Sequence, residues 1–226
     1  MTASPMFPLG TVLFPSILLP LHVFEPRYRQ LTVDCIRDDL EFGVVLIERG
    51  SEVGGGDVRT DVGTFARIVR AQPFPDGRWA LATVGTTRLR VTQWLPDDPY
   101  PSADVAPFPD APAGPHAADE LERAVTLLRQ VLALKAELGE PAAPATAELS
   151  DDLVVASYQV AALAPLGPMD HQRLLVAPGP DERIALTLEL LEEERAFLDA
   201  RLAMDANGSV EGGTIDGMDD TPGSDD

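Results

Sequence analysis

The sequence is poor in the residues that carry disulfides, phosphate binding and metal binding. Its only cysteine is Cys35, which excludes an intramolecular disulfide. Its only lysine is Lys135, and no G-x-x-x-x-G-K-[ST] phosphate loop occurs. The three histidines, His22, His116 and His171, are far apart and lack the spacing of metal ligands. We therefore expect no metal site, no cofactor and no ATP hydrolysis.

Long hydrophobic runs are also missing. A helix that crosses a bilayer needs roughly 18 or more consecutive apolar residues, and the most apolar early segment, 12–24, is interrupted by Pro15, Pro20 and His22. The first ten residues, MTASPMFPLG, contain no basic group of the kind that opens a secretory signal. With a single cysteine as well, the sequence predicts a cytoplasmic protein that makes no membrane contact.

Positive charge is scarce. The formal net charge is −20, and residues 205–226 carry 7 acidic side chains and no basic one. A protein that binds nucleic acid needs a positive surface to displace the counterions of the phosphates. The field of the whole chain opposes such binding, so we predict no nucleic-acid partner. A local arginine patch in the first half of the chain leaves RNA binding open as an alternative.

The patterning of the chain predicts four regions. Residues 1–110 are rich in strand patterns, residues 111–117 (APAGPHA) form a linker, residues 118–203 are helical, and residues 204–226 form a disordered acidic tail. In the first region we expect a helix that begins at Pro26 and a flexible glycine loop at 50–56. Strands are expected at 11–14, 17–24, 42–47, 63–74, 78–83 and 86–94. Short, bent strands of this kind predict a small closed or half-open β-barrel.

The helical region has three amphipathic patterns, at 119–138, 151–163 and 181–203, and a shorter one near 171–175. Ser150 is a candidate N-cap for the second. Helices joined by short loops predict a compact bundle. In the first region, Tyr28, Leu31, Cys35 and Ile36 recur at helical spacing, so we expect Cys35 to be buried and not to act as a nucleophile.

One segment is a candidate binding site. Residues 24–29 (FEPRYR) combine aromatic and arginine side chains at the start of the first helix. In a structural interpretation, Phe24 and Tyr28 pack inward and Glu25 pairs with Arg27. In a functional interpretation, the segment is an exposed edge that recognises unfolded peptide, because aromatics and arginine are common interface anchors. The candidate peptide-binding residues are Phe24, Glu25, Arg27 and Arg29.

Several motifs in a fixed order resemble one family. They are 7–15 (FPLGTVLFP), 18–29 (LLPLHVFEPRYR), 42–47 (FGVVLI), 62–68 (VGTFARI), 76–78 (DGR) and 85–91 (GTTRLRV). Together they resemble the LON substrate-binding domain, which opens the ATP-dependent Lon proteases. The resemblance implies an α+β protein, with a PUA-like β-barrel N-terminal domain followed by a C-terminal helical bundle.

The same resemblance implies a function in binding other proteins. Lon proteases continue into an ATPase and a Ser–Lys peptidase, and this sequence contains neither motif. We therefore expect a non-enzymatic module without catalytic residues, whose partners are unfolded or client polypeptides and a separate Lon-type protease. The sequence does not determine the oligomeric state. The alternatives are a small-molecule-binding or enzymatic barrel and a PUA-like RNA binder.

Overall fold

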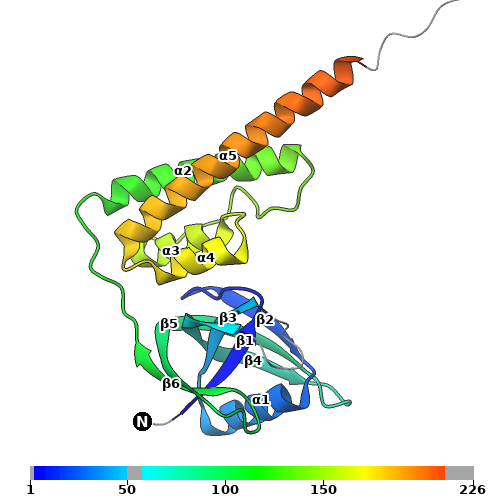
Figure 1. Cartoon of the computed structure of the whole chain (residues 1–226), viewed down its shortest axis with the longest axis vertical. Helices are drawn as coiled ribbons and strands as arrows, with labels where there is room; N and C mark the ends of the chain where they lie inside the picture. The colour runs from blue at the N-terminus through cyan, green and yellow to red at the C-terminus, as the bar shows by residue number, and fades with distance from the viewer. Residues whose placement is uncertain (1–2, 50–57, 212–226) are drawn as a thin grey trace, which may run out of the picture.

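The computed structural model describes residues 3–49 and 58–211. The predicted glycine loop at 50–56 lies outside the described residues, as does the part of the predicted acidic tail beyond residue 211. Within the described chain, a sheet with one helix occupies one end of the molecule, and four further helices occupy the other (Figure 1).

The strands form one six-stranded mixed sheet. They are β1 (Ser4–Leu9), β2 (Leu18–Val23), β3 (Phe42–Arg49), β4 (Val58–Pro73), β5 (Trp79–Leu95) and β6 (Ser102–Pro107). The order is β2-β5-β4-β3-β1-β6, and an additional β5–β6 pairing links β1, β3, β4, β5 and β6 in a closed circuit. Among the described strands, β2 pairs with β5 alone and is therefore an edge strand. The neighbours are antiparallel except β1 and β3, which are parallel.

Two strand predictions need correction. Residues 11–14 are not a strand, and the first strand is β1, which contains Pro5 and Pro8. The Met6 N–H donates to the Pro101 carbonyl (2.8 Å). The Pro8 nitrogen, which carries no hydrogen, faces the same side of β1 because backbone directions alternate along a strand. On that side β1 pairs with β6 only at Ser4 and Pro5 in the described chain. Prolines are tolerated in a strand where no partner needs their N–H. The pattern also missed β6, whose small residues and proline give no clear alternation.

Helix α1 (Pro26–Asp38) begins at Pro26, as predicted, because proline's fixed φ and missing N–H suit the first helical turn. Its buried face includes Tyr28, Leu31 and Cys35, and the Tyr28 ring stacks on Phe7 with centroids 4.0 Å apart. The predicted fourth member of this face, Ile36, is 46% exposed, so that part of the prediction is wrong.

The remaining helices are α2 (Ala117–Glu137), α3 (Leu153–Leu163), α4 (Pro168–Val176) and α5 (Pro180–Glu211). Asp152, not Ser150, caps α3, since its carboxylate accepts from Val155 N–H (2.9 Å). The Ser150 hydroxyl accepts instead from the Asp152 N–H (3.1 Å). Helix α5 continues to Glu211, past the predicted end at 203, so the first part of the predicted tail is helical.

The sheet and the helices share a core. Phe14 and Val62, from the sheet region, are buried in one cluster with Tyr158, Leu174 and Leu190 from α3, α4 and α5. Figure 1 shows α3 and α4 lying between the sheet and the α2–α5 pair. The junction between the sheet and the helices is therefore a packed interface.

Among the helices in the described ranges, none has both the length and the apolar character that a membrane span requires.

Candidate functional site

The four predicted site residues lie where β2 passes into α1, and their environments differ. Phe24 is 55% exposed, so the inward packing considered for it is wrong. Glu25 accepts from Arg27 Nε (3.1 Å), which agrees with the local pair expected from the sequence, and Tyr28 is buried. Arg29 Nη1 donates to Asp76 O (3.2 Å) in the β4–β5 turn.

Phe24 stands between two surface hollows. The first, of about 330 Å³, is lined by His22, Val23, Phe24, Phe74, Arg78 and Trp79. The second, of about 160 Å³, includes Pro20, Phe24 and Tyr28 among its lining residues. We call the first hollow, together with the free edge of β2, the edge surface. It brings Phe24 together with Phe74 and Trp79, which the sequence prediction did not include.

A weak signal for these missed aromatics was present in the sequence. Phe74 and Trp79 flank the Asp76-Gly77 turn, which was predicted to separate two strands. A hairpin places its flanking residues side by side, and Pro73 is paired with Trp79 in the β4–β5 ladder. Only the pairing of β2 with β5, in which Val23 lies opposite Trp79, brings the turn next to Phe24.

Two arginines beside the edge surface, Arg27 and Arg78, are paired with acids. Arg78 Nε lies 2.7 Å from Asp76 Oδ2, and the Arg78 backbone N–H also donates to this carboxylate, which lowers the pKa of Asp76. The Arg27 guanidinium lies 4.6 Å from the centroid of the Tyr28 ring. The edge surface therefore presents aromatic side chains, and the arginines beside them are neutralised by acids. Such a surface suits contact with apolar segments of a polypeptide.

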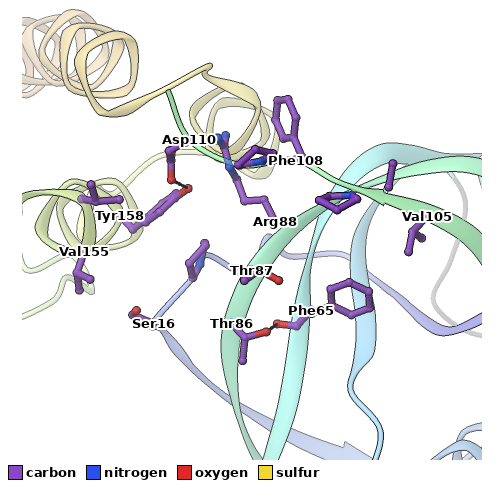
Figure 2. Close-up of a pocket in the computed structure, with 15 residues that line it drawn as sticks. Ser16, Phe65, Thr86, Thr87, Arg88, Val105, Phe108, Asp110, Val155 and Tyr158 are labelled. Carbon is purple, nitrogen blue, oxygen red and sulfur yellow. Dashed lines mark hydrogen bonds and ion pairs between the residues drawn. The ribbon is translucent and has the colours of Figure 1, made fainter. Parts of the chain in front are cut away.

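A larger cleft lies between the sheet and the helices, at the place drawn in Figure 2. It has a volume of about 620 Å³, and its lining is largely apolar. Its main apolar side chains are Pro15, Phe65, Val105, Phe108, Val155 and Tyr158. We call it the junction cleft. No sequence pattern pointed to it, because these residues come from β4, β6, α3 and the segments that follow β1 and β6.

A polar cluster holds the walls of this cleft together. Asp110 Oδ1 accepts from Arg88 Nη2 and from Arg183 Nη2, both at 2.9 Å, and Asp110 Oδ2 accepts from the Tyr158 hydroxyl (2.6 Å). Arg88 Nη1 also donates to the carbonyls of Leu175 (2.7 Å) and Ala177 (2.6 Å). One carboxylate therefore joins β5, α3 and α5.

The described residues offer little for catalysis. No group of three or more His, Cys, Asp or Glu side chains within 3–49 and 58–211 is placed to hold a metal ion. Lys135 lies 2.6 Å from Glu140 and 3.4 Å from Glu194, and hydrogen bonding to Glu140 raises its pKa. A lysine that acts as a general base needs a lowered pKa. Lys135 thus remains a charged structural group.

Comparison with known proteins identifies the family. The sequence model of the ATP-dependent protease La (LON) substrate-binding domain matches residues 3–193. The chain belongs to the LON substrate-binding domain family. Lon protease 2 of Myxococcus xanthus is 30% identical over 205 residues, which cover 86% of this chain and 24% of that protein. The Lon protease of Anaeromyxobacter dehalogenans (strain 2CP-C) is 29% identical over 209 residues, covering 86% and 23%. This LON chain thus spans about a quarter of the length of these relatives.

Solved structures share the fold. The crystal structure of a Lon N-terminal domain protein from Xanthomonas campestris has a TM-score of 0.60 and 30% identity, covering 84% of this chain and 98% of that one. The N-terminal domain of Mycobacterium avium complex Lon protease has a TM-score of 0.61 over the same shares, and at 14% identity it supports the fold alone. The resemblance predicted from motif order and the α+β class are confirmed.

Proposed function

We propose that this LON domain is a non-enzymatic module that recognises polypeptides, and that the edge surface is where it binds them. One observation carries the proposal: Phe24 is 55% exposed beside Phe74 and Trp79, just past the end of the edge strand β2. A contiguous exposed aromatic patch is typical of a surface that binds a partner. Arg27 and Arg29 would orient the bound segment, and Glu25 would hold Arg27 in place.

An added strand is the binding mode that this geometry favours. An edge strand presents unpaired main-chain groups, with which an extended peptide can form hydrogen bonds. Alternate peptide side chains would then reach the hollow at Phe24, and Leu18, which is 68% exposed, would extend the apolar strip along β2. Because the hollows are shallow, we expect weak binding with broad sequence tolerance.

The wider architecture is part of the same proposal. We propose that the closed circuit of five strands is a PUA-like β-barrel and that α2–α5 form a helical bundle, with the boundary near Asp110. A cytoplasmic location, the absence of nucleic-acid binding and cooperation with a separate Lon-type protease remain predictions. Support for a binding module over an enzyme comes from the family match, which falls on a substrate-binding domain.

The test is peptide binding by matched variants. A labelled ten-residue peptide with alternating Phe and Ser would be titrated by fluorescence anisotropy. We expect Phe24→Ser to weaken binding about tenfold, as the loss of an aromatic anchor does. Val69→Ser is the control, since Val69 is also 55% exposed but lies outside the edge surface. Equal affinity of Phe24→Ser and wild type would contradict the proposal.

A further inference from the structure

We infer that the junction cleft is a second binding site, which takes the carboxyl-terminal end of a polypeptide with apolar side chains. This inference rests on the proposed function for the polymer that is bound, but it concerns a different surface and a different chemical group. It combines two features of the described residues. One is an apolar cleft of ligand size, and the other is a local excess of positive charge in the cluster that forms its wall.

The apolar feature fits a short chain segment. The cleft volume of about 620 Å³ falls within the range of about 300–1,000 Å³ that is typical of ligand sites. Phe65, Phe108 and Tyr158 supply aromatic faces, and Val155 supplies an aliphatic one. Ser16, Thr86 and Thr87 also line the cleft.

The charge in the wall is not balanced. Arg88 and Arg183, whose side chains are 1% and 0% exposed, share Asp110 as their common carboxylate. Asp110 already accepts from both arginines and from Tyr158. Arg88 Nε and Arg183 Nη1 are buried, and neither has a hydrogen-bond partner among the residues that the structure describes. One positive charge is therefore uncompensated in a poorly solvated place, where an anion is strongly attracted.

Within this cluster, Arg88, Asp110 and Tyr158 line the cleft and Arg183 does not, so the excess positive charge acts on the cleft from within its wall. Arg88 is one of the lining residues, and its guanidinium lies 4.4 Å from the centroid of the Phe108 ring. The exposed Arg90 contacts the same ring at 4.5 Å and adds a second cation beside the cleft. A ligand that combines an apolar body with one carboxylate matches both features. In a polypeptide, an apolar C-terminal segment provides both the apolar body and the carboxylate, and it needs no acidic side chain.

The experiment compares two forms of one peptide. A peptide labelled at its N-terminus and ending in Leu-Val-Phe would be prepared as the free acid and as the amide, and titrated by anisotropy. We expect the acid to bind about tenfold more tightly, because the excess positive charge attracts its carboxylate and does not attract the neutral amide. This preference should shrink at high salt, because the rim charges are screened.

Matched variants separate charge from shape. Thr87 is exposed and lines the cleft, so we expect both Thr87→Glu and Thr87→Gln to fold. Thr87→Glu should abolish the preference for the acid by repelling a carboxylate, whereas Thr87→Gln should retain it. Arg90→Gln should reduce the preference several-fold, and Arg90→Lys should retain it.

Each outcome has a defined meaning. Equal binding of acid and amide by the wild type would overturn the inference, whatever the variants show. If both peptides then bound equally and Phe24→Ser weakened both, the proposed function would stand without a terminus site. If neither peptide bound, the inference would fail, and the alternating Phe and Ser peptide would still decide the proposed function. Displacement of the acid peptide by dodecanoate at lower concentration than by unlabelled peptide would assign the cleft to a lipid and overturn the peptide terminus.

Discussion

Cys35 and His171 both carry reactive atoms, and at the scale of single residues their burial decides what those atoms can do. Cys35 is 2% exposed on the inner face of α1, and burial, with added repulsion from Asp34 and Asp38, raises its pKa to about 12. His171 packs edge-on against Phe14, and its Nε2 lies 3.0 Å from Ala164 O. Burial lowers the pKa of His171. Both side chains are therefore neutral at pH 7.

The Cys35 thiol should be inert in the native protein. Only the thiolate attacks electrophiles, and at pH 7.5 a thiol with a pKa of about 12 is almost entirely protonated. We expect labelling by N-ethylmaleimide, followed by mass spectrometry, to be at least a hundredfold slower than for a free thiol in 6 M guanidinium. Comparable rates in the two conditions would show that Cys35 is accessible.

The lowered pKa of His171 should make the free energy of unfolding depend on pH. Because the folded pKa is lowered, the unfolded chain binds the proton first, so this contribution to stability is present above about pH 6.5 and is lost as the pH falls below it. Urea unfolding of wild type and His171→Gln at pH 7.5 and pH 5.5 would measure it. We expect the wild type to lose more stability than the variant, and an equal loss in both proteins would refute this assignment.

At the scale of elements, glycines explain two of the motifs that carried the family resemblance. A Cβ at Gly63 in β4 would lie 2.1 Å from Val44 O in β3, and a Cβ at Gly85 in β5 would lie 2.2 Å from Phe14 O. Val44 is held by the β3–β4 pairing, and the segment that contains Phe14 is held to Gly85 by the hydrogen bonds of Ser16 and Ile17, so neither oxygen can move aside freely. In the second motif, Arg88 anchors the helices and Leu89 is fully buried. The two glycines, Arg88 and Leu89 therefore maintain the fold.

Adding a methyl group at either glycine should destabilise the sheet. We expect Gly63→Ala and Gly85→Ala each to lower the free energy of unfolding by about 3 kcal/mol, as overpacking against fixed backbone does. Gly167→Ala is the control, since a Cβ there has no neighbour within 4 Å and its φ is −73°. Its cost as an N-cap change should stay near or below about 1 kcal/mol. Thermal and urea denaturation would rank the three variants.

At the scale of the whole molecule, Asp110 determines how the sheet and the helices are joined. It lies just before the predicted linker, yet its carboxylate is bonded to β5, α3 and α5. The Arg183 guanidinium also lies 3.6 Å from the centroid of the Tyr158 ring. This cluster and the apolar core shared at Phe14 and Val62 hold the helices in a fixed position against the sheet. The cleft between them therefore has a fixed wall.

Removing this one charge should weaken the entire molecule. Asp110→Asn would leave Arg88 and Arg183 buried without a counter-charge, which costs about 3–5 kcal/mol. Asp97→Asn is the matched control, because Asp97 pairs with Arg59 at 3.4 Å near the surface and its side chain is 38% exposed. Its loss should cost less than about 1 kcal/mol. Similar midpoints of the two variants in urea would contradict a structural role for Asp110.

Local patterns and motif order determined much about this protein. They predicted the α+β class, the family, the start of α1, the burial of Tyr28, Leu31 and Cys35, and the local pair of Glu25 and Arg27. These features depend on neighbours within a few positions, or on periodicity, which a sequence displays directly. The sequence pattern did not predict β1 and β6, because their prolines and small residues weaken the strand signal. Pairing to β3 and β5 nevertheless stabilises these strands.

Only the tertiary structure determined where the two surfaces proposed for binding lie. The hydrogen bonds of Asp110 to Arg88, Tyr158 and Arg183 join residues 22, 48 and 73 positions apart. The approach of Phe74 and Trp79 to Phe24 depends on the register of β2 against β5. Such contacts arise from packing whole elements together, and the residues that make them have no periodicity or spacing in common. For that reason the sequence pointed to Phe24 and its neighbours but not to the aromatics beside it, and it did not reveal the junction cleft.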